Sequence, residues 1–193
     1  MPATIAILRG RIKIGLTQIE LEELADTHRT KAVKTSRRDL AYVLSKRLNG
    51  GTTVAGTLIC SDLCGIKLFA TGGIGGVHRD GENSMDLSAD LVEMGRSSVT
   101  VVSSGIKSIL DIPRSMEVLE THGVLVATYQ CPDLEFPAFY TRTSGVKAQY
   151  NFIDARDAAE CIDKSNQVGL KSSILIGVPV MTEFSMDGMK CII

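Results

Sequence analysis

Short apolar runs alternate with amphipathic helical patterns through most of the chain. The runs rich in valine, isoleucine and leucine lie at residues 66–70, 99–102, 124–129 and 174–178. The helical patterns fill the intervals, at residues 86–95, 111–122 and 154–168. Continuous apolar runs are typical of strands that helices cover on both faces. The alternation therefore predicts an α/β fold, a layered α/β/α arrangement around a central mixed, partly parallel sheet.

The first third of the chain adds a hairpin and three helices. Residues 4–8 and 11–14 are apolar and β-branched on either side of a glycine, which predicts a hairpin or a bent strand. The expected helix caps are Thr17, Asp39, and either Thr52 or Thr53.

Length and composition indicate one folded domain, residues 1–193. The chain is 44% hydrophobic and 22% charged, close to the average of folded proteins. Its 21 basic and 22 acidic residues nearly cancel, so no charge excess favours a nucleic-acid polymer. We therefore expect no nucleic-acid polymer as a partner.

The apolar runs and the cysteines point to an intracellular protein. No run approaches the ~20 residues of a membrane span, and the first apolar run precedes the first basic residue, unlike a secretory signal. Five cysteines form no C-x-x-C pair, so neither a disulfide framework nor a zinc site is indicated. We expect no membrane association and a cytoplasmic location; an organelle-targeting segment upstream of Met1 would fall outside this sequence.

A glycine loop, residues 71–78, follows the strand predicted at 66–70. Its spacing is neither that of a dinucleotide-binding G-x-G-x-x-G nor that of a P-loop. Successive small residues can present backbone N–H groups to a sugar phosphate. A purely structural tight turn fits the same composition equally well.

Lys107 follows the strand at 99–102 through a short loop, which places its amine at the carboxyl edge of the sheet. Ligands of α/β sheets gather at that edge. A lysine nucleophile needs partial desolvation or neighbouring cations, because its amine is otherwise protonated at neutral pH. Position makes Lys107 a candidate, whereas residue type alone favours an ordinary surface lysine.

Two further polar clusters could bind ligands. Lys34, Arg37 and Arg38 precede a helix start and suit a phosphate, although a solvated loop fits as well. The cluster of Asp86, Ser88 and Asp90 suits Mg²⁺ or Mn²⁺, although simple helix capping by Asp86 or Ser88 explains it too. The segment 132–150, which holds four of the nine aromatic residues, is expected to be a flap or an interface.

Seven sequence blocks in order carry a resemblance to a known family. They are Pro2-Ala-Thr-Ile-Ala, Ser36-Arg-Arg-Asp-Leu40, Gly50-Gly-Thr-Thr-Val54, Phe69-Ala-Thr-Gly-Gly-Ile-Gly-Gly-Val-His-Arg79, Asp86-Leu-Ser-Ala-Asp-Leu91, Gly105-Ile-Lys-Ser-Ile-Leu-Asp111 and Glu135-Phe-Pro-Ala-Phe-Tyr140. Together they closely resemble the pseudouridine-5′-phosphate glycosidase family, also called the indigoidine synthase A family. The blocks cover the chain to about residue 180, and residues 181–193 form a divergent tail.

The resemblance implies an enzyme that reversibly cleaves the C–C glycosidic bond of pseudouridine 5′-phosphate to uracil and ribose 5-phosphate. Lys107 matches the family nucleophile, which forms a covalent adduct with C1′ of the sugar. Asp86 matches the ligand of a divalent metal, expected to be Mn²⁺. The substrate-binding positions it implies are Lys34, Val54, Ser88, Ala89 and Asp90. The implied assembly is a homotrimer.

The resemblance also has departures. The family's general acid/base glutamate lies in a segment that would precede Met1, so no residue here takes that role, and some eukaryotic members carry a fused sugar kinase. We therefore expect a chain truncated at both ends and inactive or weakly active alone. Two alternatives stay open: a non-catalytic binding or subunit-interaction remnant, and an aldolase-like Schiff-base enzyme of sugar phosphates.

Overall fold

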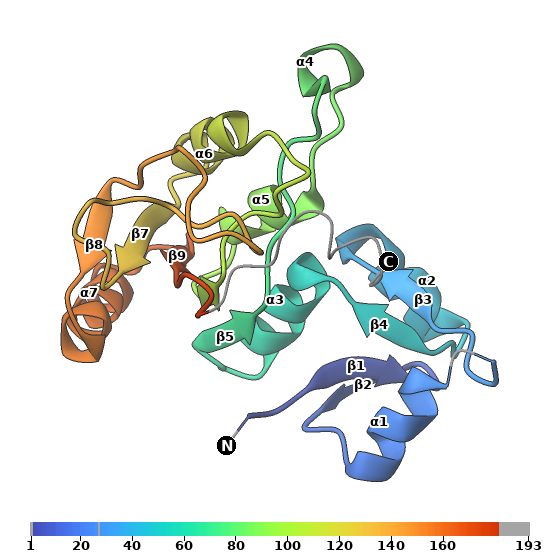
Figure 1. Ribbon diagram of the computed structural model, residues 1–193. Helices are drawn as coiled ribbons and strands as arrows, with labels where there is room; N and C mark the ends of the chain where they lie inside the picture. Colours follow the sequence, from blue (N-terminus) through green and yellow to red (C-terminus); the bar gives the residue numbers. More distant parts are fainter. Residues whose placement is uncertain (1, 27, 182–193) are drawn as a thin grey trace. The chain divides into compact units, whose positions relative to one another are not determined.

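The computed structural model of the chain describes residues 2–26 and 28–181 (Figure 1). Two units, Met1–Gly65 and Ile66–Ile193, each contain a sheet of their own. The predicted α/β class with partly parallel strands is confirmed, and the described strands divide between two sheets where we expected one central sheet. The single domain over residues 1–193 stays a prediction.

The first unit is built on a four-stranded mixed sheet with the order β2-β1-β4-β3. Its strands are β1 (Ile5–Leu8), β2 (Arg11–Ile14), β3 (Val33–Thr35) and β4 (Gly50–Thr52). The predicted hairpin is confirmed as β1 and β2, paired antiparallel. β4 runs antiparallel to β1 and parallel to β3.

The helices of the first unit are α1 (Gln18–Ala25), α2 (Arg37–Ser45) and α3 (Val54–Leu63). The caps predicted at Thr17 and Thr53 are confirmed, since each side chain accepts a backbone N–H of its helix. The start of α2 differs from our prediction: Ser36 is its N-cap, and Asp39 lies inside the helix, accepting the Ser36 N–H at 3.0 Å. A serine three residues before an acid completes a capping box, which outweighs capping by the acid itself.

The second unit contains five parallel strands in the order β5-β6-β9-β7-β8. They are β5 (Leu68–Thr71), β6 (Thr100–Ser103), β7 (Leu125–Tyr129), β8 (Tyr150–Phe152) and β9 (Ile174–Gly177). The helices are α4 (Gly81–Ser84), α5 (Ala89–Met94), α6 (Ile112–Thr121) and α7 (Ala155–Val168).

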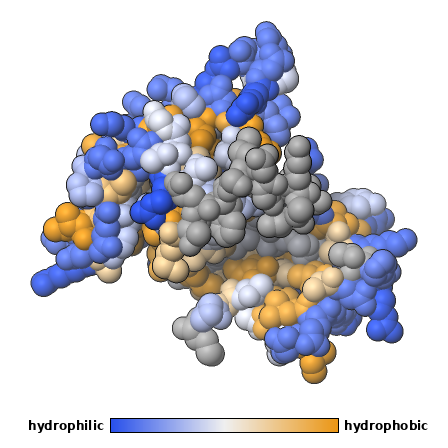
Figure 2. Space-filling model, viewed as in Figure 1, coloured by the Kyte–Doolittle hydropathy of each residue, from blue (hydrophilic) through white to orange (hydrophobic). Residues whose placement is uncertain are grey.

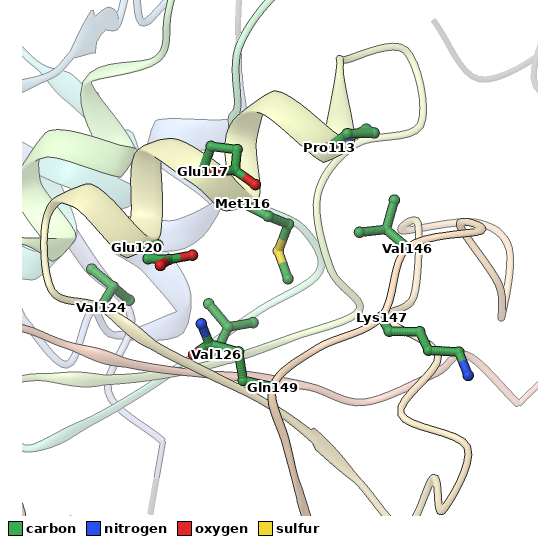
Figure 3. Close-up of a pocket in the computed structure, with 9 residues that line it drawn as sticks. All are labelled: Pro113, Met116, Glu117, Glu120, Val124, Val126, Val146, Lys147 and Gln149. Atoms are coloured by element: carbon green, nitrogen blue, oxygen red, sulfur yellow. The ribbon is translucent and has the colours of Figure 1, made fainter.

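Neighbouring residues of β7 show that this sheet is covered on both faces. Ala127 belongs to a buried cluster with Ala158 of α7. Val126, the preceding residue, lines a pocket with Met116 of α6, whose side chain points toward it in Figure 3. Successive strand residues point to opposite faces, so α6 and α7 lie on opposite sides of the sheet. The second unit therefore has the predicted α/β/α layering.

The remaining expectations concern the membrane, the cysteines and the tail. Within the described residues, no helix combines the length and apolar character needed to cross a membrane. Cys60, Cys64, Cys131 and Cys161 are free thiols. The predicted tail, beyond Met181, and Cys191 lie outside the described residues.

Candidate active site

The loops that leave β5 and β6 continue the parallel pairing of those strands. Thr71 and Ser103 are partners at the strand ends. Beyond them, Ser104 N donates to Gly72 O at 2.8 Å, and Ile74 N donates to Gly105 O at 3.1 Å. The two glycine-containing loops thus lie side by side at the carboxyl edge of the sheet, where α/β sheets bind their ligands.

Lys107 makes the last of the backbone hydrogen bonds that join these two loops. Its backbone N–H donates to Ile74 O at 3.2 Å, and its carbonyl accepts from Leu110 N at 3.0 Å. Its side chain is exposed. Lys107 therefore stands at the sheet edge, as expected, with a fixed backbone and an accessible amine; its role as a nucleophile stays a prediction.

Gly105 shows how tightly the Lys107 loop is packed. Its φ is +100°, and a Cβ built on it would lie 1.9 Å from Pro137 O. Only glycine tolerates such a backbone together with such a close approach. Pro137 belongs to the segment 136–139, in which Phe136 is fully buried and Phe139 N donates to Ser104 O at 2.8 Å. This part of the predicted flap thus packs against the loop that carries Lys107.

Phe139 also covers the glycine loop. A Cβ on Gly73 would lie 2.5 Å from the Phe139 ring, so the ring rests directly on the loop backbone. The Tyr140 ring follows, with its centroid 4.1 Å from that of Phe139. Phe139, one of the four aromatic residues counted in the segment 132–150, thus forms part of the wall of the candidate site.

The glycine loop is largely used by the protein itself. The N–H groups of Ile74, Gly75 and Val77 donate to Gly105 O, to Asp90 Oδ2 and to Ser115 Oγ, respectively. These three groups cannot also cradle a phosphate. The alternative of a structural turn, which composition alone left open, describes this loop better.

Ser88, Ala89 and Asp90 form the start of α5. Ser88 is the N-cap, with its hydroxyl accepting from Asp90 N, so the capping alternative is confirmed for Ser88. Ala89, which follows it, is exposed. Asp90 is 8% exposed, and its Oδ2 accepts the Gly75 N–H at 2.9 Å. Asp90 therefore anchors the glycine loop, and its contact with substrate stays a prediction.

Asp86 and His78 lie at the two ends of the segment 78–86, which holds α4 and projects from the second unit (Figure 1). Asp86 O accepts from His78 N at 2.9 Å, and Asp86 Oδ2 lies 3.9 Å from His78 Nδ1. Both side chains are more than half exposed. The segment is mostly hydrophilic on its surface (Figure 2).

The residues around Asp86 do not form a closed metal site. Within residues 2–26 and 28–181, no three His, Cys, Asp or Glu side chains gather closely enough to hold a metal ion. One exposed carboxylate fits only a hard cation that keeps most of its water ligands. The assignment of Mn²⁺ to Asp86 stays a prediction.

Lys34 and Val54 occupy the corresponding edge in the first unit. Lys34 pairs with Gly51 in the parallel β3–β4 ladder, and its side chain is exposed. Val54 is the first residue of α3, two residues beyond β4. Thr53 N donates to Thr35 O at 3.0 Å, which ties the two strand ends together. The structure thus places both predicted substrate-binding residues at the carboxyl ends of neighbouring strands.

Arg38, one of the predicted cations next to Lys34, forms an ion pair at the surface. Arg38 lies 3.6 Å from Asp39, and its side chain is 91% exposed. This geometry is that of a solvated surface ion pair.

Cys131 follows β7 and is a second nucleophilic side chain in this unit. Burial and a hydrogen bond from its Sγ to Asp133 raise the pKa of the Cys131 thiol. A raised pKa keeps the sulfur protonated and weakly nucleophilic at neutral pH.

Sequence reasoning missed Ser115, which is fully buried and bonds to the glycine loop. One signal was available: Ile112, Ser115 and Leu119 are spaced to share one face of α6, and all three are buried. A small polar residue on an apolar stripe indicates that a backbone approaches closely there.

A pocket of about 180 Å³ lies between α6 and the segment 146–149 (Figure 3). Val124, Val126 and Met116 give it an apolar floor, and Glu120 and Lys147 lie on its rim. Its lining includes neither Lys107 nor the glycine loop, so it is separate from the candidate active site.

The geometry defines a class of protein before any comparison is made. A parallel sheet that carries an accessible lysine and a glycine loop at its carboxyl edge defines an α/β protein with a candidate small-ligand site. Comparison with known proteins then specifies the family. Residues 1–192 match the family described as "Indigoidine synthase A like protein", and the chain belongs to that family.

Its relatives include several curated proteins. The chain is 50% identical over 187 residues to the pseudouridine-5′-phosphate glycosidase of Caldanaerobacter subterraneus, covering 97% of this chain and 60% of that protein. It is 52% identical over 190 residues to a pseudouridine-metabolizing bifunctional protein of Schizosaccharomyces pombe, covering 98% of this chain and 25% of that protein. The chain thus spans about 60% of the glycosidase and a quarter of the bifunctional protein.

Solved structures show the same fold. The prealnumycin C-glycosynthase AlnA, in complex with ribulose 5-phosphate, has a TM-score of 0.89 at 36% identity, covering 99% of this chain and 62% of that chain. An indigoidine synthase A-like protein of Thermotoga maritima has a TM-score of 0.88 at 32% identity, covering 98% of this chain and 62% of that chain.

Proposed function

We propose that this chain takes part in cleaving the C–C glycosidic bond of pseudouridine 5′-phosphate, with Lys107 as the nucleophile. The observation that carries the proposal is the position of Lys107, whose backbone is fixed by the ladder to Ile74 while its side chain is exposed at the sheet edge. The names of its relatives support the substrate. The pentose phosphate bound to AlnA supports a sugar phosphate as ligand of this fold.

The proposed reaction needs a nitrogen that donates electrons to C1′, because the carbon of uracil is a poor leaving group. The neutral amine of Lys107 attacks C1′, the bond from C1′ to the ring oxygen breaks, and the proton lost by the nitrogen goes to that oxygen. The nitrogen lone pair then forms the C=N bond of an imine as the bond between C1′ and C5 of uracil breaks, and C5 takes a proton. Water then hydrolyses the imine, which releases ribose 5-phosphate and returns the amine.

The other predicted residues take binding roles in this proposal. Lys34, with its exposed ammonium, pairs with the substrate phosphate. Val54 and the Ser88–Asp90 segment line the proposed substrate-binding site. Asp86 would hold Mn²⁺ through its carboxylate, and the cation would supply positive charge near the phosphorylated sugar. The proposed assembly is a homotrimer, which sedimentation of the purified chain tests.

The proposal is tested by measuring uracil release from pseudouridine 5′-phosphate. The 193-residue chain is compared with a chain extended to the length of its relatives, because it spans about 60% of the glycosidase that it matches. We expect release by the longer chain and little by the shorter one. Aldol cleavage of a sugar phosphate without uracil release would replace the proposal with the aldolase alternative.

A further inference from the structure

Ser115 joins α6 to the glycine loop by its side chain. It is fully buried, its Oγ accepts the Val77 N–H at 2.8 Å, and its hydroxyl donates to Asp111 O at 2.6 Å. Asp111 N in turn donates to Val77 O at 2.9 Å. The N-terminal end of α6 therefore holds Val77 through two hydrogen bonds, and a third joins Ser115 to Asp111.

The loop approaches Ser115 so closely that only glycine fits beside it. A Cβ on Gly76 would lie 2.4 Å from Ser115 Oγ and 3.0 Å from a methyl group of Ile106. Ile106 is the residue before Lys107 and forms a parallel bridge with Ile74. Gly76 is therefore packed closely against both the Ser115 hydroxyl and Ile106, the residue before Lys107.

A connected set of contacts leads from Ser115 to Lys107. Ser115 fixes Val77, the chain runs back from Val77 to Ile74, and Ile74 O accepts the Lys107 N–H at 3.2 Å. We infer that Ser115 is a positioning residue for Lys107: its hydroxyl sets the glycine loop, and the loop sets the lysine backbone at the sheet edge. The inference rests on the proposed function for the role of Lys107, whereas the placement itself can be tested without it.

The matched control is Ser173, a second buried serine of the same unit. It is 1% exposed, and its hydroxyl donates to Ser97 O at 3.0 Å, so it bonds to neither loop of the site. Ser115→Ala and Ser173→Ala remove the same atom from equally buried positions. Gly76→Ala is a second test variant, because its added Cβ displaces the loop from Ser115 without changing Ser115 itself.

The placement is measured by amide hydrogen exchange on peptides spanning residues 104–110, which reports local opening. We expect faster exchange there in Ser115→Ala and Gly76→Ala than in the wild-type chain, and no change there in Ser173→Ala. Unchanged exchange in both test variants overturns the inference. Equal acceleration in Ser173→Ala also overturns it, because the effect would then be general loss of stability.

The consequence for Lys107 is measured with ribose 5-phosphate and borohydride on a chain extended to the length of its relatives. At saturating sugar phosphate, Ser115→Ala should slow adduct formation on Lys107 roughly 10- to 100-fold, since a misplacement near 1 Å costs about that much. Ser173→Ala should match the wild type. Faster exchange with an unchanged adduct rate overturns the positioning role. Absence of any adduct in the wild type counts against the proposed function, while the exchange result still decides whether Ser115 places the loop.

Discussion

The two sheet edges that carry the candidate residues are built differently. In the second unit, hydrogen bonds, a buried carboxylate and a covering aromatic ring hold the backbone around Lys107. In the first unit, Lys34 lies on a three-residue strand with its side chain in solvent, beside a helix start. One edge fixes a backbone, and the other presents a charge.

This difference separates two kinds of contribution to a site. A covalent step depends on placing the reacting atom, which requires a rigid frame. Recognition of a phosphate depends mainly on charge, which a flexible side chain supplies well. Substitutions in the packed loops around Lys107 should therefore affect folding and adduct formation. Substitutions at the sheet edge that carries Lys34 should affect substrate binding alone.

The largest effect is expected from Gly105→Ala. The added Cβ would overlap Pro137 O, and the positive φ adds strain, so unfolding should become easier by about 3 kcal/mol or more. Gly145→Ala is the control, because Gly145 also has a positive φ, +77°, but nothing lies within 4 Å of its Cβ. The control should lose only about 1–2 kcal/mol. Urea unfolding measures both, and equal losses would show that the packing of the frame contributes nothing.

Lys34→Ala should raise KM for pseudouridine 5′-phosphate about tenfold, since it removes a charge-assisted hydrogen bond to the phosphate. KM for the dephosphorylated nucleoside should stay constant. Lys31→Ala, another exposed lysine of the same segment, serves as control. Steady-state kinetics decide it, and equal increases for both substrates would contradict phosphate binding by Lys34.

Asp86→Asn should weaken Mn²⁺ binding by at least about fivefold, because removing one unit charge from a solvated contact is worth about 1 kcal/mol. The fold should persist, since the side chain is exposed and keeps its shape. Calorimetric titration with Mn²⁺ measures the effect. Identical titrations for the two proteins would remove Asp86 from the metal site.

The smallest effect is expected at Glu20 in the first unit, a residue with no proposed part in the reaction. The quantity affected is the stability of the fold at low pH. Hydrogen bonds from Lys13 and from the Thr17 backbone lower the pKa of Glu20 from 4.5 to about 2. A folded-state pKa below the unfolded one gives stability that is present above pH 4.5 and is lost as the pH falls toward 2. The urea midpoint should fall across this window, and Glu20→Gln should flatten the fall. Glu22→Gln on the same helix should leave the fall unchanged. A wild-type urea midpoint that does not depend on pH would refute the contribution of Glu20 to stability.

Strong local patterns predicted most of the fold. The capping box at Thr17, the apolar stripe of α6 and the continuous run of β9 each carry their own signal, and the structure places these elements where expected. The short strands β3, β4 and β8 were missed. β4 is Gly50–Thr52, whose glycines indicate a helix end by composition, and its strand geometry comes from pairing with β1 and β3.

The candidate site was predictable only in part. The position of Lys107 after β6 follows from the strand pattern alone, because carboxyl ends of parallel strands share an edge. The bonds of Asp90 to Gly75 and of Ser115 to Val77 join residues 15 and 38 positions apart. Such contacts depend on how helices pack over the loop, which no local pattern encodes.

The most direct test of the account is to map where a sugar phosphate becomes attached. In a chain extended to the length of its relatives, ribose 5-phosphate and borohydride should leave one reduced adduct, on Lys107, when the protein is digested and its peptides are weighed. Lys107→Ala should abolish the label, and so should Lys107→Arg, because a guanidinium stays protonated. Lys147→Ala, an exposed lysine of the same unit, should retain it. A label on another lysine, or an undiminished label in Lys107→Ala, would contradict the central claim that the fixed edge of the second unit exists to place this amine.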